Sequence, residues 1–288
     1  MITLSNGHVF EYMTASGALG YDGKGWPHEK ALVWLELIRP ELFTNVAKTI
    51  TVLPRQGNFR WDNPFGCVRF MRGGVLNAVG MGNNGSAWWY EKIGRGVSRQ
   101  KESLIASVYF ESEPQMEEMA KMLNLVDLVG VEVNARCPNL SPSPYWQCPE
   151  AIVRNCREFK ILLRHPLLLK LSVEDKIKRI LPWVEGFVEA VSINSVRWKV
   201  IFPNKKSPLV HLGGGGVSGK ITQPIVWPFI SDIARYSSIP VIGSAIWDFD
   251  DLARVRAAGA KAISFGSVFM PYPWRPASFV RKEMEGKS

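Results

Sequence analysis

The chain has 288 residues, of which 46% are hydrophobic and 21% are charged, a balance that excludes a disordered protein. No apolar run approaches the roughly 20 residues needed to span a bilayer, and the start lacks the layout of a secretion signal, so we expect a cytoplasmic protein. The net charge of +9 suits a small anionic substrate or a phosphate-bearing cofactor, and the scattered basic residues disfavour nucleic-acid binding.

The chain opens with residues 2–12, where an Asn6-Gly7 turn predicts a small hairpin. Apolar segments then alternate with amphipathic ones. The predicted strands are residues 11–16, 45–51, 104–110, 128–134, 166–172, 189–194, 239–244 and 261–267. The predicted helices are residues 28–38, 86–97, 115–126, 149–163, 174–187, 223–237 and 248–260. Residues 52–85, rich in Gly, Pro and Asn, interrupt this alternation as a long insertion after the second strand.

This order of elements indicates an α/β fold. Parallel strands need crossover helices, so repeated strand–helix alternation predicts a parallel sheet. About eight repeats with continuously apolar strands favour a (β/α)8 TIM barrel, formed as a single domain by residues 1–288, with a doubly wound open sheet as the alternative. The N-terminal hairpin would then plug the bottom of the barrel.

Polar residues stand where several predicted strands end. Lys48-Thr49, Asn134, Lys170 and Asn194-Ser195 follow or end apolar segments. In a barrel these ends meet at the face that carries the active site. Because lysine is almost never buried without a partner, two lysines and two asparagines at matching ends favour a functional site over chance.

Glycine and serine mark the later strand ends. HLGGGGVSGK (211–220) precedes the seventh predicted strand, and the last two strands end in Gly243-Ser244 and Gly266-Ser267. Glycine permits close approach to a ligand, and phosphate sites in barrels commonly follow strands seven and eight. These segments predict a phosphorylated cofactor, whereas the absence of GxGxxG after the first strand argues against a Rossmann dinucleotide site.

The four cysteines, at positions 67, 137, 148 and 156, are irregularly spaced and include no CxxC pair. We therefore expect neither a disulfide framework nor a metal site. A free cysteine is usually a small buried hydrophobe, which is our interpretation of Cys67 and Cys156. Cys137 differs because it lies in VEVNARCPNL (131–140), where a predicted strand gives way to a polar loop.

Taken in order, these segments resemble the dihydroorotate dehydrogenase family of FMN-dependent barrels, from about residue 12 to residue 270. Singly most are unspecific, but the ordered set is specific. They are ASG (15–17), KTITVLPRQGN (48–58), LNAVGMGN (76–83), VNARCPN (133–139), LLLKLS (167–172), INS (193–195), GGVSG (215–219), PVIGSA (240–245) and ISFGS (263–267).

The resemblance implies that Cys137 is the catalytic base, taking a proton from C5 of dihydroorotate while FMN accepts hydride from C6. Binding of this small anionic pyrimidine would involve Lys48, Asn77, Val79, Gly80, Met81, Asn139, Asn194 and Ser195. FMN would be held by Ala15, Ser16, Gly17, Lys48, Thr49, Asn134, Lys170, Ile193, Ser218, Gly219, Gly243, Ser244, Ala245, Gly266 and Ser267. Lys170 would stabilise negative charge at the N1/O2 edge of the flavin.

The resemblance is to the soluble members with a cysteine base, because membrane-bound relatives use serine and carry an N-terminal hydrophobic extension. The electron acceptor stays open between fumarate and NAD, the latter reached through a separate iron–sulfur flavoprotein subunit. Family members commonly form homodimers.

Three departures from the family pattern bear on the substrate more than on the cofactor. Arg136 stands where a small or hydroxyl residue usually precedes the cysteine, VRWKVIFPNKK (196–206) replaces a glycine-containing segment, and Gly243-Ser244-Ala245 replaces a more frequent Gly-Gly. Three other functions are alternatives to dihydroorotate oxidation: a tRNA-dihydrouridine synthase, a dihydropyrimidine-type FMN reductase, and a catalytically silent barrel subunit. A tRNA-dihydrouridine synthase usually carries a helical tRNA-binding domain, for which the short tail after the barrel leaves little room.

Overall fold

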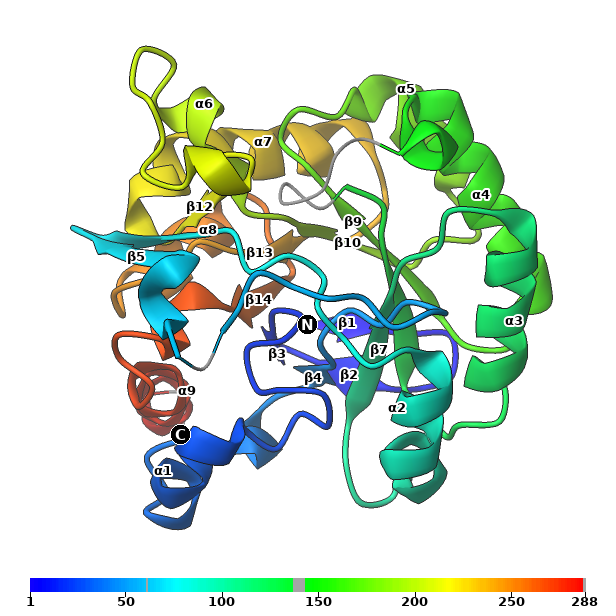
Figure 1. The fold of residues 1–288 in the computed structure, drawn as a ribbon, viewed down its shortest axis with the longest axis horizontal. Helices are drawn as coiled ribbons and strands as arrows, with labels where there is room; N and C mark the ends of the chain where they lie inside the picture. Colours follow the sequence, from blue (N-terminus) through cyan, green and yellow to red (C-terminus); the bar gives the residue numbers. More distant parts are fainter. Residues whose placement is uncertain (61, 137–142, 287–288) are drawn as a thin grey trace.

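The computed structural model describes residues 1–60, 62–136 and 143–286. Within these residues, parallel strands curl around a common centre and the helices lie outside them (Figure 1). One sheet has the order β10-β9-β8-β7-β4 and another the order β13-β14-β3. The parallel strands are β3 (Tyr12–Thr14), β4 (Asn45–Val46), β7 (Leu104–Val108), β8 (Gly130–Asn134), β9 (Leu167–Leu171), β10 (Ala190–Ile193), β13 (Ile242–Gly243) and β14 (Ala262–Phe265).

The two parallel sheets are connected at both edges by isolated bridges. Met13 bridges Thr44 beside β4, and Val191 of β10 bridges Val241 beside β13. Each predicted strand contains an observed one, which is shorter than predicted. The α/β class and the parallel direction of the sheet are therefore confirmed.

Helices cover the outside of the curled sheet, from α1 and α9 at the lower left of Figure 1 to α7 at the top and α3 at the right. All seven predicted helices overlap an observed one, and α3 begins two residues before its predicted range, whereas α6 and α9 were not predicted. The helices are α1 (Lys30–Trp34), α2 (Ser86–Lys92), α3 (Glu113–Leu123), α4 (Pro149–Leu162), α5 (Ile177–Val184), α6 (Trp198–Ile201), α7 (Gln223–Tyr236), α8 (Asp251–Ala257) and α9 (Arg275–Glu285). None of the helices formed by the described residues has both the length and the apolarity needed to cross a bilayer.

The predicted N-terminal hairpin is confirmed, with β1 (Ile2–Thr3) antiparallel to β2 (Val9–Phe10). Its buried side chains Ile2, Leu4 and Phe10 form one apolar cluster with residues at the starts of the parallel strands. The strand residues in this cluster are Met13, Val46, Ile105, Val129, Leu168, Ala190, Ile242 and Ala262. The hairpin thus closes the amino-terminal end of the curled sheet, as predicted, and leaves the carboxyl ends for the polar residues.

Replacing Phe10 by alanine should lower the free energy of unfolding by about 3–5 kcal/mol, because it opens a cavity in this floor. Phe10 is 5% exposed, whereas Val9 beside it is 50% exposed. Val9→Ala is therefore the matched control, with an expected loss of about 0.5 kcal/mol or less. Urea unfolding of both variants measures the difference, and equal losses would show that the hairpin does not pack as a plug.

The insertion after β4 forms part of a four-stranded antiparallel sheet that the sequence did not predict. In the described residues this sheet has the order β11-β12-β6-β5. Its strands are β5 (Val68–Met71), β6 (Gly74–Asn77), β11 (Val196–Arg197) and β12 (Gly216–Ser218). The sheet joins the insertion to the segment that follows β10, so it brings Asn77 beside Gly216.

Candidate active site

Three adjacent strands, β8, β9 and β10, carry polar residues on one face. Side chains alternate between the two faces of a strand, so Glu132 and Asn134 share a face of β8 while Val131 and Val133 take the other. The register places Lys170 beside both Asn134 and Ser192. Polar groups from neighbouring strands are thus aligned on the inner face, and the apolar residues between them pack outward in the main core.

A buried ion pair lies at the centre of this face. Lys170 Nζ lies 3.3 Å from Glu132 Oε1, and Ser192 Oγ donates to Glu132 Oε2 at 2.6 Å. Glu132 is 1% exposed and Lys170 is 7% exposed. Lys170 was a predicted site residue, whereas Glu132 and Ser192 were missed. A glutamate inside the otherwise apolar run LVGVEVN was the available signal.

A chain of hydroxyl and amide groups crosses the carboxyl ends of the strands. Thr49 Oγ1 lies 3.0 Å from Ser16 Oγ and 3.1 Å from Ser107 Oγ. Asn134 Nδ2 donates to Thr49 Oγ1 at 3.2 Å, and Asn194 Nδ2 donates to Asn134 Oδ1 at 2.8 Å. The structure therefore brings together predicted residues that are far apart in the sequence, and it adds Ser107.

The predicted substrate loop lies against Lys48. Lys48 Nζ donates to the carbonyl of Gly80 at 3.3 Å. Buried Asn83 anchors the loop, because its side chain accepts from the Gly85 N–H at 2.9 Å and donates to the Met81 carbonyl at 2.8 Å. Asn77 ends β6 beside this loop, so Lys48, Asn77, Val79, Gly80 and Met81 lie in one region.

A tightly held turn follows β13. The Asp251 carboxylate accepts from the backbone N–H groups of Trp247 and Asp248, both at 2.9 Å, and from Gln223 Nε2 at 2.8 Å. Gln223 Nε2 also donates to the carbonyl of Ala245 at 3.0 Å. Neither Gln223 nor Asp251 was a predicted site residue, and both are buried.

Ala245 in this turn has a φ of +67°, a left-handed conformation that favours glycine. Such strain is typically kept where a site needs it. In the part of the chain that the structure describes, no protein oxygen accepts from the backbone N–H groups of Ala245 and Ile246, so both can donate to a ligand.

Close packing surrounds several predicted glycines. A Cβ at Gly219, whose φ is +102°, would lie 2.8 Å from Gly74 Cα and from the Trp247 ring. Gly219 therefore lets the β12 segment approach the turn after β13, and Ser218 stands beside it. Gly243 and Ile193 are directed to the helix layer instead: a Cβ on Gly243 would meet Val255 at 2.5 Å, and Ile193 belongs to the main core. Only their backbones are candidates for cofactor contact.

The other predicted residues at this end follow from strand pairing. Ala15, Ser16 and Gly17 follow β3, whereas Gly266 and Ser267 follow β14, which pairs with β3. The backbone N–H of Ala15 donates to the Phe265 carbonyl at 2.7 Å. Ser195 directly follows Asn194 and leads into β11.

Arg136 lies two residues after the end of β8 and contacts residues that follow the neighbouring strands. Its guanidinium Nε lies 3.1 Å from Asp175 Oδ1, and its Nη2 donates to the Gln147 carbonyl at 2.8 Å. Its carbonyl accepts from Asn194 Nδ2 at 2.6 Å. Arg136 thus packs among β8, β9 and β10, and Asp175 was not predicted. The predicted base Cys137 and the predicted substrate residue Asn139 lie outside the described residues.

Asp175 gives a testable pH dependence of stability. Burial raises the pKa of its carboxyl above the ordinary value of 3.8, against the lowering effects of the Ser172 N–H and of Arg136. The folded protein then holds this proton more tightly than the unfolded chain, so the free energy of unfolding falls as pH rises from about 3.8 through the raised pKa.

In Asp175→Asn the free energy of unfolding should not fall in this way as pH rises. The wild type should therefore lose stability relative to the variant between about pH 3.5 and about pH 6.5. Urea unfolding at both pH values measures the difference. Glu118→Gln is the control, because Glu118 is exposed on α3 and does not affect the pKa of Asp175. A difference that grows in the opposite direction would mean that the ion pair with Arg136 outweighs burial.

The remaining cysteines differ in exposure. Cys67 and Cys156 are buried, and burial raises the pKa of the Cys156 thiol to about 12, so this thiol stays protonated and inert. Cys148 is exposed and precedes α4. Among the described residues, no group of three or more His, Cys, Asp or Glu side chains is placed to bind a metal.

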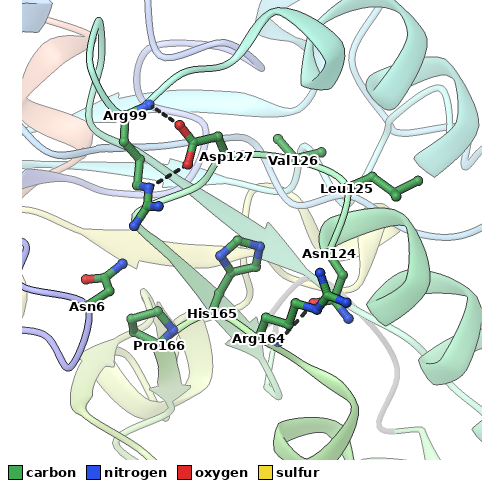
Figure 2. A pocket seen from close by; sticks show the side chains of 9 residues that line it. All are labelled: Asn6, Arg99, Asn124, Leu125, Val126, Asp127, Arg164, His165 and Pro166. Atoms are coloured by element: carbon green, nitrogen blue, oxygen red, sulfur yellow. Dashed lines mark hydrogen bonds and ion pairs between the residues drawn. The ribbon is translucent and has the colours of Figure 1, made fainter.

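A separate surface pocket of about 360 Å³ lies at the opposite end of the strands, beside the N-terminal hairpin (Figure 2). Its polar groups mainly bind one another: Arg99 pairs with Asp127 at 2.6 Å, and Asn124 accepts from the Arg164 backbone N–H at 2.9 Å. Burial lowers the pKa of His165, and its ring lies 3.0 Å from the Leu123 carbonyl. These contacts cap the ends of α3 and α4, so the pocket is explained by structure alone.

Comparison with known proteins identifies the family of the chain. Residues 22–284 match the profile of the family described as dihydroorotate dehydrogenase. A relative from Thermoanaerobacter sp., named dihydroorotate dehydrogenase B (NAD(+)), catalytic subunit, is 30% identical over 261 residues, which are 88% of this chain and 82% of the relative. The chain belongs to the dihydroorotate dehydrogenase family. A relative of the same name from Methanocaldococcus jannaschii is 31% identical over 230 residues, 76% of this chain and 73% of the relative.

Among solved structures, the family fold recurs in a crystal structure described as ligand-free type DHODH from Eimeria tenella. The TM-score is 0.73 at 14% identity, over 94% of this chain and 82% of that chain. At this identity the likeness concerns the fold alone. The family prediction made from the ordered motifs is confirmed.

Proposed function

We propose that this chain is the catalytic subunit of a dihydroorotate dehydrogenase, which oxidises dihydroorotate to orotate in pyrimidine biosynthesis. The observation that carries the proposal is the convergence of Lys48, Asn134, Lys170 and Asn194 at the carboxyl ends of the parallel strands. The family match and the names of the relatives support it. A tRNA-dihydrouridine synthase is disfavoured by the same match.

The residues at this end fit FMN. Lys170 supplies a cation suited to the electron-rich N1/O2 edge of a flavin, and the amides of Asn134 and Asn194 supply polar contacts. The N–H groups of Ala245 and Ile246, with the hydroxyls of Ser218, Ser244 and Ser267, are the donors that a phosphate needs. FMN, when bound, supplies the acceptor for the hydride that leaves C6 of dihydroorotate.

The protein supplies the acid–base step and the orientation of the substrate. Cys137 takes the proton from C5, as the family motif implies. Asn77, Asn139, Asn194 and Ser195 would hydrogen-bond the pyrimidine ring and its carboxylate, and Lys48 offsets the negative charge of the substrate. Arg136, held by Asp175, fixes the carbonyl that receives a hydrogen bond from Asn194.

The proposal also covers the closure of the barrel, the number of domains and the partner subunits. We infer that the curled sheet is a complete (β/α)8 barrel and that residues 1–288 form one domain; the floor cluster, with a residue from each of the parallel strands or their starts, supports this. The relatives' names state a catalytic subunit and NAD(+), which supports a second, electron-transferring subunit of the iron–sulfur flavoprotein kind. A homodimer is the expected state of the barrel itself.

Titration with dihydroorotate tests the activity. Purified protein loaded with FMN should lose the visible absorbance of its flavin on addition of dihydroorotate without oxygen, and orotate should form in equal amount. Dihydrouracil and tRNA that contains dihydrouridine serve as the alternative substrates, because only a dihydropyrimidine can give a hydride to oxidised FMN. Bleaching with dihydrouracil or tRNA but not with dihydroorotate would assign the chain to another reaction.

A further inference from the structure

We infer that Glu132 tunes the reduction potential of the bound flavin by partly cancelling the charge of Lys170. The inference rests on the proposed function, because it takes FMN as the cofactor beside Lys170. Neither a catalytic nor a binding role is required of Glu132 itself. It acts through Lys170 and through its own charge.

The contacts of Glu132 are fully internal. Its side chain is 1% exposed, and one carboxylate oxygen faces Lys170 Nζ at 3.3 Å while the other accepts from Ser192 Oγ at 2.6 Å. It precedes Asn134 by two residues on the same face of β8, so it lies one layer below the strand ends. A charge in this position is one layer from any ligand that Lys170 and Asn134 contact.

The burial cost makes a purely structural role a poor explanation. Taking a carboxylate and an ammonium out of water costs several kcal/mol per ion, and an apolar pair of similar volume is often as stable. The pair instead orients the ammonium: Ser192 holds the carboxylate, and the carboxylate holds Lys170.

The sign of the effect follows from charge. Two-electron reduction makes the flavin more negative, so a nearby cation raises its potential and a nearby anion lowers it. With Glu132 ionised the pair has no net charge, whereas without it Lys170 has a full positive charge. Glu132→Gln should therefore favour reduced over oxidised FMN by tenfold or more, which is about 30 mV or more for a two-electron couple.

The experiment is a redox titration of FMN-loaded protein against reference dyes, with a chemical reductant in place of dihydroorotate. Glu132→Asp keeps the charge and should keep the wild-type potential, whereas Glu132→Gln should raise it. Ser192→Ala removes a hydrogen bond without changing the charge and should change the ratio of reduced to oxidised FMN less than threefold. An unchanged or lower potential in Glu132→Gln overturns the inference.

If Glu132→Gln does not fold, a comparison of two other variants tests the effect of Glu132 on the flavin potential. Lys170→Met leaves a net negative charge, and the double variant Glu132→Gln/Lys170→Met leaves none, so the double variant should have the higher potential. Equal potentials would exclude an effect of Glu132 on the flavin.

The outcomes also separate the inference from the proposed function. A wild type that binds no FMN overturns both. A wild type whose FMN is reduced by dihydroorotate, with Glu132→Gln at the same potential, overturns only the inference. A shifted potential in protein that dihydroorotate does not reduce supports the inference and rejects the substrate.

Discussion

Cys137→Ala should slow the reduction of bound FMN by dihydroorotate by about 10²–10⁴-fold, the usual contribution of a general base. The affinity for FMN should be unchanged, because the predicted cofactor contacts come from the strand ends and not from this thiol. Anaerobic stopped-flow measurement of the flavin absorbance gives the rate, and equilibrium titration gives the affinity. The prediction depends on the N-x-x-C-P-N motif, since Cys137 lies outside the described residues.

Cys148→Ala is the matched control. Cys148 is exposed at the start of α4, eleven residues after Cys137, and no proposed contact involves it. Its variant should reduce FMN at the wild-type rate. A Cys137→Ala variant that also keeps this rate would remove Cys137 from the base role and leave the family assignment without its catalytic residue.

Lys170→Met should lower the free energy of unfolding of the FMN-free protein by about 3–5 kcal/mol. The substitution leaves the Glu132 carboxylate buried with Ser192 as its remaining partner among the described residues. An unpaired buried charge costs far more than a lost surface contact. Urea unfolding at neutral pH measures the loss, and FMN affinity should fall in parallel.

The double variant Glu132→Gln/Lys170→Met should recover most of this loss, because it removes both charges. Lys121→Met is the control for losing a lysine ion pair: its partner Glu117 is 3.9 Å away on the exposed side of α3, so the expected loss is about 0.5 kcal/mol or less. If Lys170→Met and Lys121→Met lost the same amount, the Lys170–Glu132 pair would not be buried as described.

The fold was predicted from the local pattern of hydrophobic residues along the chain. The strands that were predicted are short, continuously apolar runs, and the predicted helices are amphipathic with a period near 3.6. β5 and β6 form a local hairpin, but the pairing that joins them to β12 was missed because it is not local: Ser218 of β12 lies beside Val75 of β6, 143 residues away in the chain. Helix α9 was missed because it begins in PYPWRP, where two prolines precede Arg275.

The candidate site was also predicted only in part. Lys48, Asn134, Lys170 and Asn194 were predicted because polar residues at the ends of apolar strands are unusual, and the resemblance supplied their roles. Asp175 and Asp251 were missed because acidic residues near a helix start are common and usually exposed. Both are instead buried, Asp175 against Arg136 and Asp251 against backbone N–H groups.

Sequence alone was sufficient to predict the parallel sheet, the plugging hairpin, the polar strand ends and the family, because each depends on residues that are near one another in the chain or on motif order. It did not predict that Glu132 binds Lys170 and Ser192, or that Thr49 links Ser16 to Asn134. Those contacts depend on the register between strands, and a shift of one residue would turn each side chain to the opposite face. Register is set by packing of the whole sheet, so it was visible only once the chain was folded.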